Sequence, residues 1–534
     1  MQYAMLDNLI DTLTLDELIG QVMCESVLGL TDEEIEKKMR TYKPGCVFTM
    51  YQTPEFNKKV MDIANRYSKI PVIMVSDIEN GPGSCIKGLP NLPQPMAWGA
   101  CNDEKLIEEA GEETAKLCRL NGIHWTFGPI VDLNINPDNP ECNIRSASDN
   151  PDKVIKIIGA HLKGLTKNGY MVTSCKHFPG QGTDDRNSHF STTINPLSKS
   201  KWMKTYGKVY KKLIKQGTSS IMVGHTSLPF AERKKANIYE YLPTTVSKPV
   251  ITNLLKEKLG YSGCVMSDAV SMVGMLSRVS AERRIIEFFK AGGDAFLYPK
   301  PEEYEYLKNA VLSGEIPLSR LKDAVKRTLK VKVDARLFED QAKVLSEIKL
   351  GRDIGEIAQE IANKSIKVVR NGLGVIPAKL NKGAKVAFVN IPGKFFYDEP
   401  DGTEFAPMKK VFEDNGYIVD EYVRGIKEPK DGLFDYDLVI VNCRTSSRNY
   451  HGGSLRLGWG EIESAMPVFE NPNLIFVSHG DPYKIREFHF VKQYINTFSV
   501  TDDSQVAVAN VILGKLTPTA KNPVSMKPFF EIEN

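Results

Sequence analysis

The sequence has no long apolar run and no closely paired cysteines. No stretch approaches the roughly 20 apolar residues that span a bilayer. The nine cysteines stand singly, without a C-x-x-C pair, which argues against a zinc site or a disulfide framework and for buried, reduced thiols. Residues 1–21 mix acidic with apolar side chains and lack a basic segment. We therefore expect an amphipathic helix there, no secretory signal peptide and a cytoplasmic protein.

The chain also lacks an excess of charge of either sign. Its 69 basic and 66 acidic residues leave a formal net charge of +3. This balance gives no electrostatic reason to expect a nucleic acid or an anionic membrane as partner, and it favours a small or neutral substrate. With 534 residues, 42% of them hydrophobic and 25% charged, the chain is long enough for two or three globular domains.

Short apolar runs alternate with amphipathic helical stretches between residues 40 and 300, which is typical of a parallel sheet covered by helices. Seven strands are predicted, one fewer than a complete barrel: 45–48, 72–75, 124–127, 172–175, 220–223, 263–266 and 295–297. Polar residues follow five of them: Asp77, Asp132, Lys176 with His177, His225 and Asp268. Barrel enzymes place their chemistry at such strand ends, although doubly wound sheets also bind ligands there.

The remainder of the chain is first helical and then α/β. Residues 301–380 are charged and helical in pattern. Beyond them, strands are expected at 385–390, 438–442 and 474–478, with a helix over 405–415. This pattern predicts a smaller three-layer domain.

The most informative segment runs from Tyr170 to His189. Its apolar residues end at Lys176 and His177, and a loop rich in proline and glycine follows, Phe-Pro-Gly-Gln-Gly-Thr-Asp-Asp-Arg-Asn-Ser-His. The strand fixes the first two polar side chains, and the sharp turns of the loop bring His189 back over the strand end. The pattern predicts an active site here.

This segment resembles the signature of glycoside hydrolase family 3, especially its β-N-acetylhexosaminidase branch, where Lys-His-Phe-Pro-Gly precedes an Asp-Ser-His dyad. Nearly the whole chain resembles the family in collinear stretches: 13–22, 122–132 with Arg145, 242–268, 477–483 and 508–524. The resemblance implies a (β/α)8 TIM barrel over residues 1–340, a helical connector over 341–382 and a smaller three-layer α/β sandwich domain over 383–534.

The family implies an exo-acting, retaining glycosidase. Retention needs a carboxylate beneath the anomeric carbon, and a group that protonates the leaving oxygen and later activates water. Asp268 resembles the nucleophile. An Asp after a buried strand is also often only a cap for the following helix, and that alternative stays open.

His189 resembles the general acid/base. An imidazole, with an unperturbed pKa of about 6.5, can give and accept a proton near neutral pH. Asn187 stands where the family's dyad has Asp. Its carbonyl can accept the Nδ1 proton and fix the tautomer, but it offers no negative charge to an imidazolium. We expect a less basic His189 than in the usual dyad, unless Asp184 or Asp185 supplies the charge. A loop histidine with only a structural hydrogen bond is the alternative.

Four further residues resemble the family's sugar ligands: Asp77, Arg145, Lys176 and His177. For His225, both a substrate contact and a packing role stay open. Charged groups suit sugar binding because they form bidentate hydrogen bonds with paired hydroxyls. For Lys176, the alternative is an ion pair with a barrel carboxylate. No metal or other cofactor is expected, because His and Cys are dispersed and the reaction needs only Asp and His.

The acid/base loop favours a β-N-acetylglucosaminidase acting on a small oligosaccharide or glycoconjugate. A β-glucosidase or β-xylosidase stays open, because the Arg common in N-acetylglucosaminidases is missing near Cys85. Such enzymes usually take their acid from a C-terminal Glu, here Glu461 or Glu463. A catalytically silent sugar-binding protein is the third possibility, suggested by Asn187 and Gln181. Whether phosphate can replace water as acceptor stays open.

Restoring the dyad carboxylate with Asn187→Asp should raise the pKa of His189, because a negative charge stabilises the imidazolium. The pH-rate limb that reports loss of the acid should then move to higher pH. Identical pH-rate profiles of the two proteins would contradict an effect of the residue at position 187 on the pKa of His189.

Overall fold

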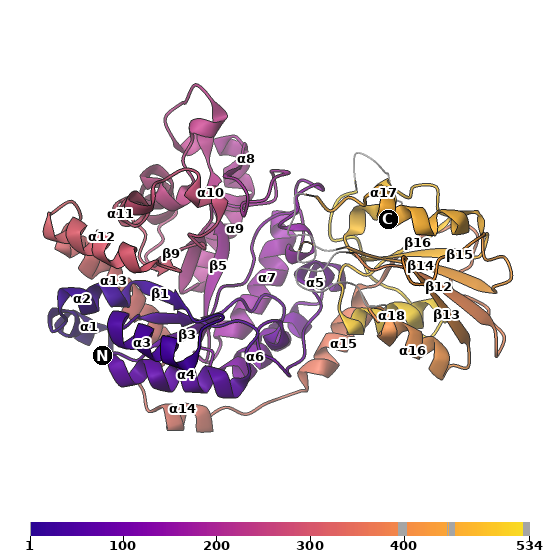
Figure 1. The fold of residues 1–534 in the computed structure, drawn as a ribbon, viewed down its shortest axis with the longest axis horizontal. Coiled ribbons are helices and arrows are strands. Elements are labelled where there is room, and N and C mark those ends of the chain that lie inside the picture. Colours follow the sequence, from indigo (N-terminus) through magenta and orange to yellow (C-terminus); the bar gives the residue numbers. More distant parts are fainter. Residues whose placement is uncertain (1, 394–402, 446, 448–453, 527–534) are drawn as a thin grey trace. The chain divides into compact units, whose positions relative to one another are not determined.

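The computed structural model describes residues 2–393, 403–445, 447 and 454–526, drawn in Figure 1. The chain forms two compact units. The first contains Met1–Asn91, Glu104–Leu133 and Val154–Ile354, and the second contains Leu92–Asp103, Asn134–Lys153 and Gly355–Asn534. Within the described residues, no helix has the length and apolar character needed to cross a membrane. All nine cysteines are free, and eight are buried.

The first unit contains an eight-stranded parallel sheet in the order β10-β1-β2-β3-β4-β5-β7-β9. A bridge between Met266 and Ala295 joins the two end strands, so the sheet closes. The predicted (β/α)8 barrel is confirmed. The strands are β1 (Met23–Ser26), β2 (Cys46–Phe48), β3 (Ile73–Ser76), β4 (Trp125–Thr126), β5 (Val172–Phe178), β7 (Ser220–Val223), β9 (Cys264–Ser267) and β10 (Phe296–Leu297).

The strand absent from the sequence prediction is β1. It is four residues long and carries Glu25, whose charge interrupts the apolar pattern. The structure buries this side chain to 2% exposure against Lys38, whose Nζ lies 2.6 Å away, and the Tyr304 hydroxyl, 2.9 Å away. Because these partners lie far away in sequence, no local pattern predicts that a charged residue belongs to a barrel strand.

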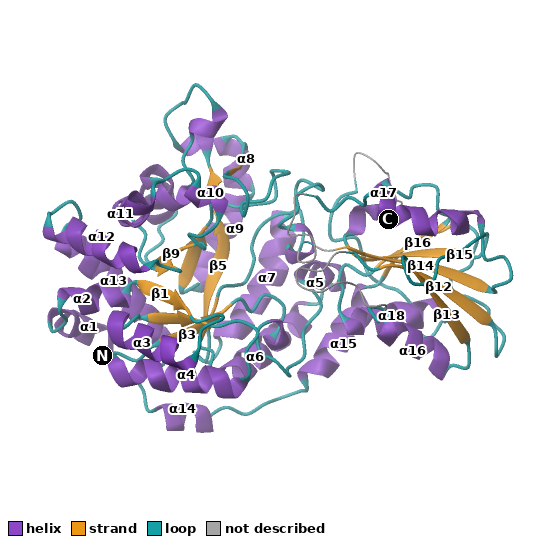
Figure 2. Cartoon of the chain, viewed as in Figure 1, coloured by secondary structure: helices purple, strands orange, loops and turns teal. Residues whose placement is uncertain are grey.

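Helices cover the outside of the barrel (Figure 2). Thr14 and Thr31 begin two of them with capping boxes, in which a threonine side chain and a glutamate three residues later bond to each other's backbone N–H groups. The helices are α1 (Gln2–Asp11), α2 (Leu15–Gln21), α3 (Asp32–Tyr42), α4 (Pro54–Tyr67), α6 (Glu104–Leu120), α7 (Pro151–Thr166), α8 (Lys199–Lys204), α9 (Tyr206–Gln216), the π-helix η6 (Pro249–Lys258), α10 (Val273–Leu276), α11 (Ala281–Ala291), α12 (Pro301–Leu312), α13 (Leu318–Asp334) and α14 (Gln341–Ser346).

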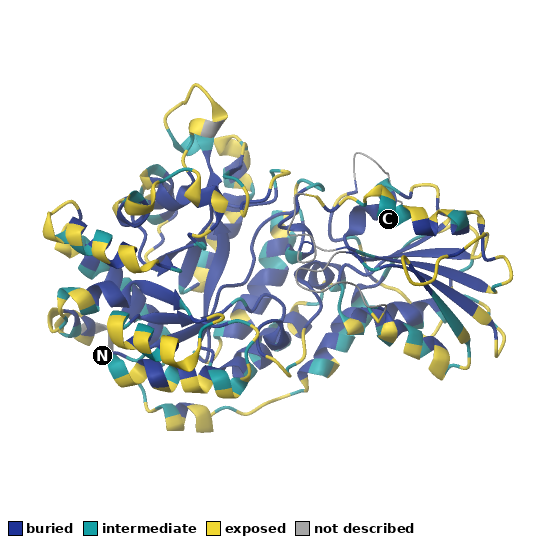
Figure 3. Ribbon diagram, viewed as in Figure 1, coloured by how far each residue is buried: buried dark blue, intermediate teal, exposed yellow. Residues whose placement is uncertain are grey.

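The amino end of the barrel is held by a buried carboxylate. Asp294, which is fully buried just before β10, accepts the N–H of Val265 in β9 at 2.9 Å. Lys256 and Arg320 bond to the same carboxylate at 3.0 and 2.9 Å. The charged residues at this end therefore stabilise the closure of the barrel. The strands are buried in Figure 3, and the predicted catalytic groups lie at their other end.

The second unit is a three-layer α/β sandwich, as predicted. Its six strands follow the order β11-β16-β15-β14-β12-β13, and all are parallel except β11 against β16. One face of the sheet packs against α15, α16 and α18, and the other against η7 and α5. The elements are α5 (Pro95–Cys101), α15 (Ile354–Ser365), β11 (Lys367–Asn371), β12 (Lys385–Ile391), α16 (Ala406–Asp414), β13 (Ile418–Val423), β14 (Leu438–Thr445), α17 (Trp459–Ile462), η7 (Glu463–Glu470), β15 (Leu474–Gly480), β16 (Gln493–Asn496) and α18 (Asp502–Ile512).

The second unit also includes chain from inside the segment predicted as barrel. Met96 and Ala97 of α5, and Ile144, belong to the hydrophobic core under the sandwich sheet. The segment predicted as a connector supplies α15 and β11 to the same unit. The two units are therefore built from alternating stretches of the sequence. The predicted domains, each a single continuous range, do not describe this arrangement.

Candidate active site

Six of the polar residues identified in the sequence lie at the carboxyl ends of barrel strands in the first unit. Two of them, Lys176 and His177, are part of β5 itself, which runs to Phe178. The others follow β3, β4, β7 and β9: Asp77, Asp132, His225 and Asp268.

Lys176 lies between two carboxylates. Its Nζ is 2.7 Å from Asp77 Oδ1 and 2.8 Å from Glu79 Oε1, and its side chain is 4% exposed. The ion pair considered for Lys176 is therefore present. Asp77 retains 29% exposure, so its carboxylate is oriented by the lysine while still open to a ligand.

His177 is held by a second carboxylate. Its Nδ1 lies 2.7 Å from Oδ2 of the fully buried Asp132, which also accepts the backbone N–H groups of His177 and Gln181 at 3.2 and 2.8 Å. A carboxylate at Nδ1 fixes the proton on that nitrogen and stabilises the imidazolium. Asp132 is thus a positioning residue, and the sequence signal for it was its place after a strand.

Asp268 follows β9 directly. Its backbone N–H donates to Val223 in β7 at 3.0 Å, and its Oδ1 accepts the N–H of Ala269 at 2.7 Å. The helix-cap alternative does not describe it, because the N-cap of α10 is Met272.

Burial by itself raises the pKa of Asp268, but the surrounding charges reverse the effect. His177 makes the largest contribution of the opposite sign, followed by His225, the Ala269 N–H and Lys176, and the net result is a lowered pKa. A half-buried carboxylate that stays ionised is suited to nucleophilic attack on a bound substrate.

His225 supports the peptide after Asp268. Its Nε2 bonds to the Ala269 carbonyl at 2.9 Å and its Nδ1 to the Thr245 hydroxyl at 2.8 Å, and the side chain is fully buried. Both ring nitrogens bond to protein atoms, so the packing alternative describes His225 in this structure.

His189 lies exposed on the loop after β5, and Asn187 orients it. The Asn187 Oδ1 lies 2.8 Å from His189 Nδ1 and accepts the His189 backbone N–H at 2.9 Å. The carboxylate of Asp184 binds Arg186 at 2.6 Å and the N–H of Ile194 at 2.7 Å. An amide therefore occupies the orienting position at the ring nitrogen, without the charge of a carboxylate.

The loop that carries His189 is hydrogen-bonded to the chain that follows Asp268. Val273 donates its N–H to the His189 carbonyl at 3.0 Å, and Gly274 donates to the Ser188 carbonyl at 3.2 Å. A Cβ at Gly274 would lie 2.5 Å from that carbonyl and 3.1 Å from His225 Cβ. Only glycine fits here, and this requirement was not visible in the sequence.

Three residues named in the sequence analysis, Arg145, Glu461 and Glu463, lie in the second unit. Arg145 ends the short helix η2 (Asn143–Arg145) and donates to the Glu141 carbonyl at 3.0 Å; its role as a sugar ligand stays a prediction. Glu461, a candidate acid under the glucosidase alternative, accepts the N–H of Gly458 at 2.7 Å as a helix cap.

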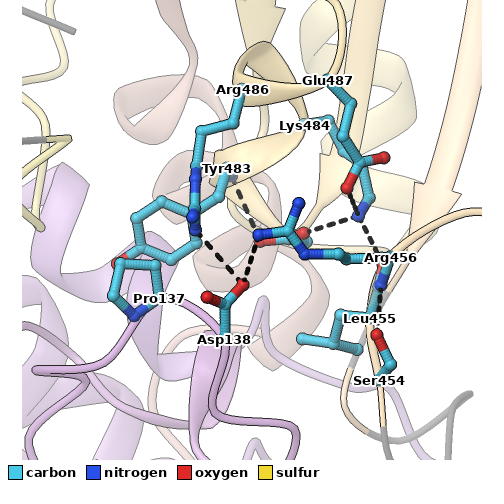
Figure 4. A pocket seen from close by; sticks show the side chains of 10 residues that line it. Pro137, Asp138, Ser454, Leu455, Arg456, Tyr483, Lys484, Arg486 and Glu487 are labelled. Carbon is cyan, nitrogen blue, oxygen red and sulfur yellow. Dashed lines mark hydrogen bonds and ion pairs between the residues drawn. The ribbon is translucent and has the colours of Figure 1, made fainter. Parts of the chain in front are cut away.

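The second unit also encloses a small polar cavity of about 20 Å³ (Figure 4). Its charges are paired: Arg456 and Arg486 each reach Asp138, at 3.0 and 3.3 Å, and Lys484 reaches Asp481 at 3.0 Å. The space suits about one water molecule. It offers no room for a sugar.

Residues 14–331 match the family described as "Glycosyl hydrolase family 3 N terminal domain". The chain belongs to this family. The resemblance seen in the sequence is confirmed, and the protein is a glycosidase that acts on carbohydrate substrates.

Relatives with different sugar preferences are similar to this chain. A "Beta-N-acetylglucosaminidase/beta-glucosidase" of Cellulomonas fimi is 25% identical over 95% of this chain and 93% of its own length. The structure of a "Beta-glucoside phosphorylase BglX bound to 2FGlc" superposes with a TM-score of 0.89, at 26% identity and with 98% and 97% of the two chains covered. A family 3 β-N-acetylglucosaminidase from Paenibacillus sp. str. FPU-7 shares the fold, with a TM-score of 0.82 at 23% identity over 96% and 99% of the chains.

Replacing His177 with Asn should raise the pKa of Asp268, because it removes the largest charge contribution that keeps this pKa low. Activity that needs the ionised carboxylate is lost as the pH falls through its pKa. The acidic limb of kcat/KM should therefore move to higher pH, measured with an aryl glycoside. Asn187→Asp is the matched control, because it should move only the basic limb. An unmoved acidic limb in the His177 variant would contradict the electrostatic account.

Proposed function

We propose that this protein is a retaining β-N-acetylglucosaminidase that removes terminal β-linked N-acetylhexosamine from small oligosaccharides or glycoconjugates. The observation that carries the proposal is the pairing of two groups at one barrel end. Asp268 is a half-buried carboxylate with a lowered pKa, and His189 is an exposed imidazole on a loop hydrogen-bonded to the chain after Asp268.

In the first step, an Asp268 oxygen attacks the anomeric carbon and the bond to the leaving oxygen breaks. His189 gives its proton to that oxygen, so the aglycone leaves as a neutral alcohol. In the second step, neutral His189 takes a proton from water while the water oxygen attacks the same carbon, which releases Asp268 as a carboxylate and the sugar with its original configuration. Asp77, held by Lys176, is open to accept hydrogen bonds from sugar hydroxyls.

A second candidate is the same reaction on β-glucosides. It is favoured by the joint name of the Cellulomonas fimi relative and by the similarity to the β-glucoside phosphorylase. The phosphorylase similarity also supports phosphate as an alternative acceptor. A histidine base is uncharged when it receives the acceptor's proton, so it does not repel an anion as a carboxylate base would.

Aryl β-N-acetylglucosaminide and aryl β-glucoside, each assayed with and without phosphate, separate these candidates. We expect turnover of the first substrate and free N-acetylglucosamine as product. Turnover of the glucoside alone would establish the second candidate, and accumulation of a sugar 1-phosphate would establish phosphorolysis. Tight sugar binding without turnover of either substrate would show a silent protein and overturn the proposal.

Asp268→Ala should abolish turnover. His189→Ala should slow cleavage of poor leaving groups by roughly a hundredfold or more, while sparing the first step on activated aryl leaving groups that need no proton. Pre-steady-state release of phenols of graded acidity measures this difference. Equal loss on poor and activated leaving groups would count against His189 as the acid.

A further inference from the structure

Tyr298 follows β10 and lies at the same end of the barrel as Asp268. Its backbone N–H donates to the Cys24 carbonyl of β1 at 2.9 Å. The preceding residue, Leu297, donates to the hydroxyl of Ser267 at 2.9 Å, and Ser267 immediately precedes Asp268. The strand pairing therefore places Tyr298 beside the proposed nucleophile.

The Tyr298 ring closes the barrel core on the side of the active site. It meets Phe48 at the end of β2 edge to face, with centroids 5.2 Å apart and planes at 71°. The ring is only partly buried, and it packs against the cluster of side chains inside the barrel together with Ala269, the residue after Asp268. One edge of the ring is therefore fixed by the core, while the side chain retains an accessible surface.

The backbone of Tyr298 has a φ of +59°, in the left-handed region that bulky L residues rarely adopt. Glycine would adopt this conformation at lower cost, so the side chain is kept here despite an unfavourable backbone. Such residues concentrate at sites where a side chain must be held in one position for function.

The hydroxyl of Tyr298 is a protonated donor close to two acidic residues. Burial first, and then the charges of Asp77 and Asp268 among its neighbours, raise the pKa of this phenol well above its usual value. In the described part of the chain, the hydroxyl has no protein hydrogen-bond partner. Its hydrogen is available to a bound molecule.

We propose that Tyr298 is a substrate-binding residue whose hydroxyl donates a hydrogen bond to an oxygen of the sugar bound between Asp77 and Asp268. Both carboxylates only accept hydrogen bonds when ionised, so a sugar hydroxyl that donates to one of them still has lone pairs to be satisfied. The phenol supplies the missing donor without adding charge next to the nucleophile. The inference rests on the proposed function for the position of the sugar over Asp268. It does not depend on whether that sugar is N-acetylglucosamine or glucose.

Tyr298→Phe tests the inference because it removes one hydroxyl and keeps the ring contact with Phe48. The expected result is a roughly five- to hundredfold loss of kcat/KM on the better aryl glycoside, with the Tm unchanged. Tyr170→Phe is the matched control. That buried tyrosine lies just before β5, at the opposite end of the barrel, and its loss of a hydroxyl should leave kinetics unchanged.

Deoxy analogues of the substrate separate sugar contact from a structural effect. The penalty of Tyr298→Phe should disappear for the analogue that lacks the contacted oxygen and persist for the others. Binding of N-acetylglucosamine and glucose to the wild-type protein and Tyr298→Phe gives a readout that needs no turnover, so failure of the proposed reaction would not hide the outcome. Kinetics and sugar affinity within twofold of wild type, or an equal penalty on every analogue, would overturn the assignment.

Discussion

The candidate active site depends on keeping a half-buried carboxylate charged. Burial favours protonation of Asp268, and the neighbouring positive groups reverse that preference. These groups are themselves anchored by acids: Lys176 by Asp77 and Glu79, and His177 by Asp132. Acidic side chains after β3, β4 and β9 thus surround the two basic side chains of β5. The strand order of the barrel creates this arrangement, because it brings residues nearly 200 positions apart to one rim.

Asn187 changes the electrostatics of this arrangement more than its geometry. The amide oxygen reaches the imidazole of His189 as a carboxylate oxygen would, and it also accepts the backbone N–H of the histidine. Orientation and charge, which a carboxylate supplies together, are therefore separated in this protein. Under the proposed function, an uncharged partner suits a group that must release a proton in one step and take one up in the next.

The sequence predicted the parts of the fold and site that local patterns encode. The apolar runs that end at Asp77, Lys176 and Asp268 are barrel strands, and these three residues lie at their ends. The runs were predictable because strand length and alternation with helices are local properties of the sequence. Strand β1 was not predicted, because Glu25 interrupts its apolar pattern and the residues that pair with Glu25 lie outside the strand. Residues 92–103 and 134–153 were assigned to the barrel, because an apolar residue such as Met96 does not reveal which core it will join. Tyr298 was missed because an aromatic residue at a strand end carries no charge, and from sequence alone it could equally belong to the core.

The hydrogen bonds that Ser188 and His189 receive from Gly274 and Val273 join the loop of the proposed acid/base to the loop that follows the proposed nucleophile. Neither loop can be exchanged by itself between relatives. A graft of residues 180–194 into another barrel would arrive without its support unless residues 268–277 came with it, including the glycine that lets the two backbones touch. Diversity in leaving-group specificity within this scaffold should accordingly arise through paired changes in both loops.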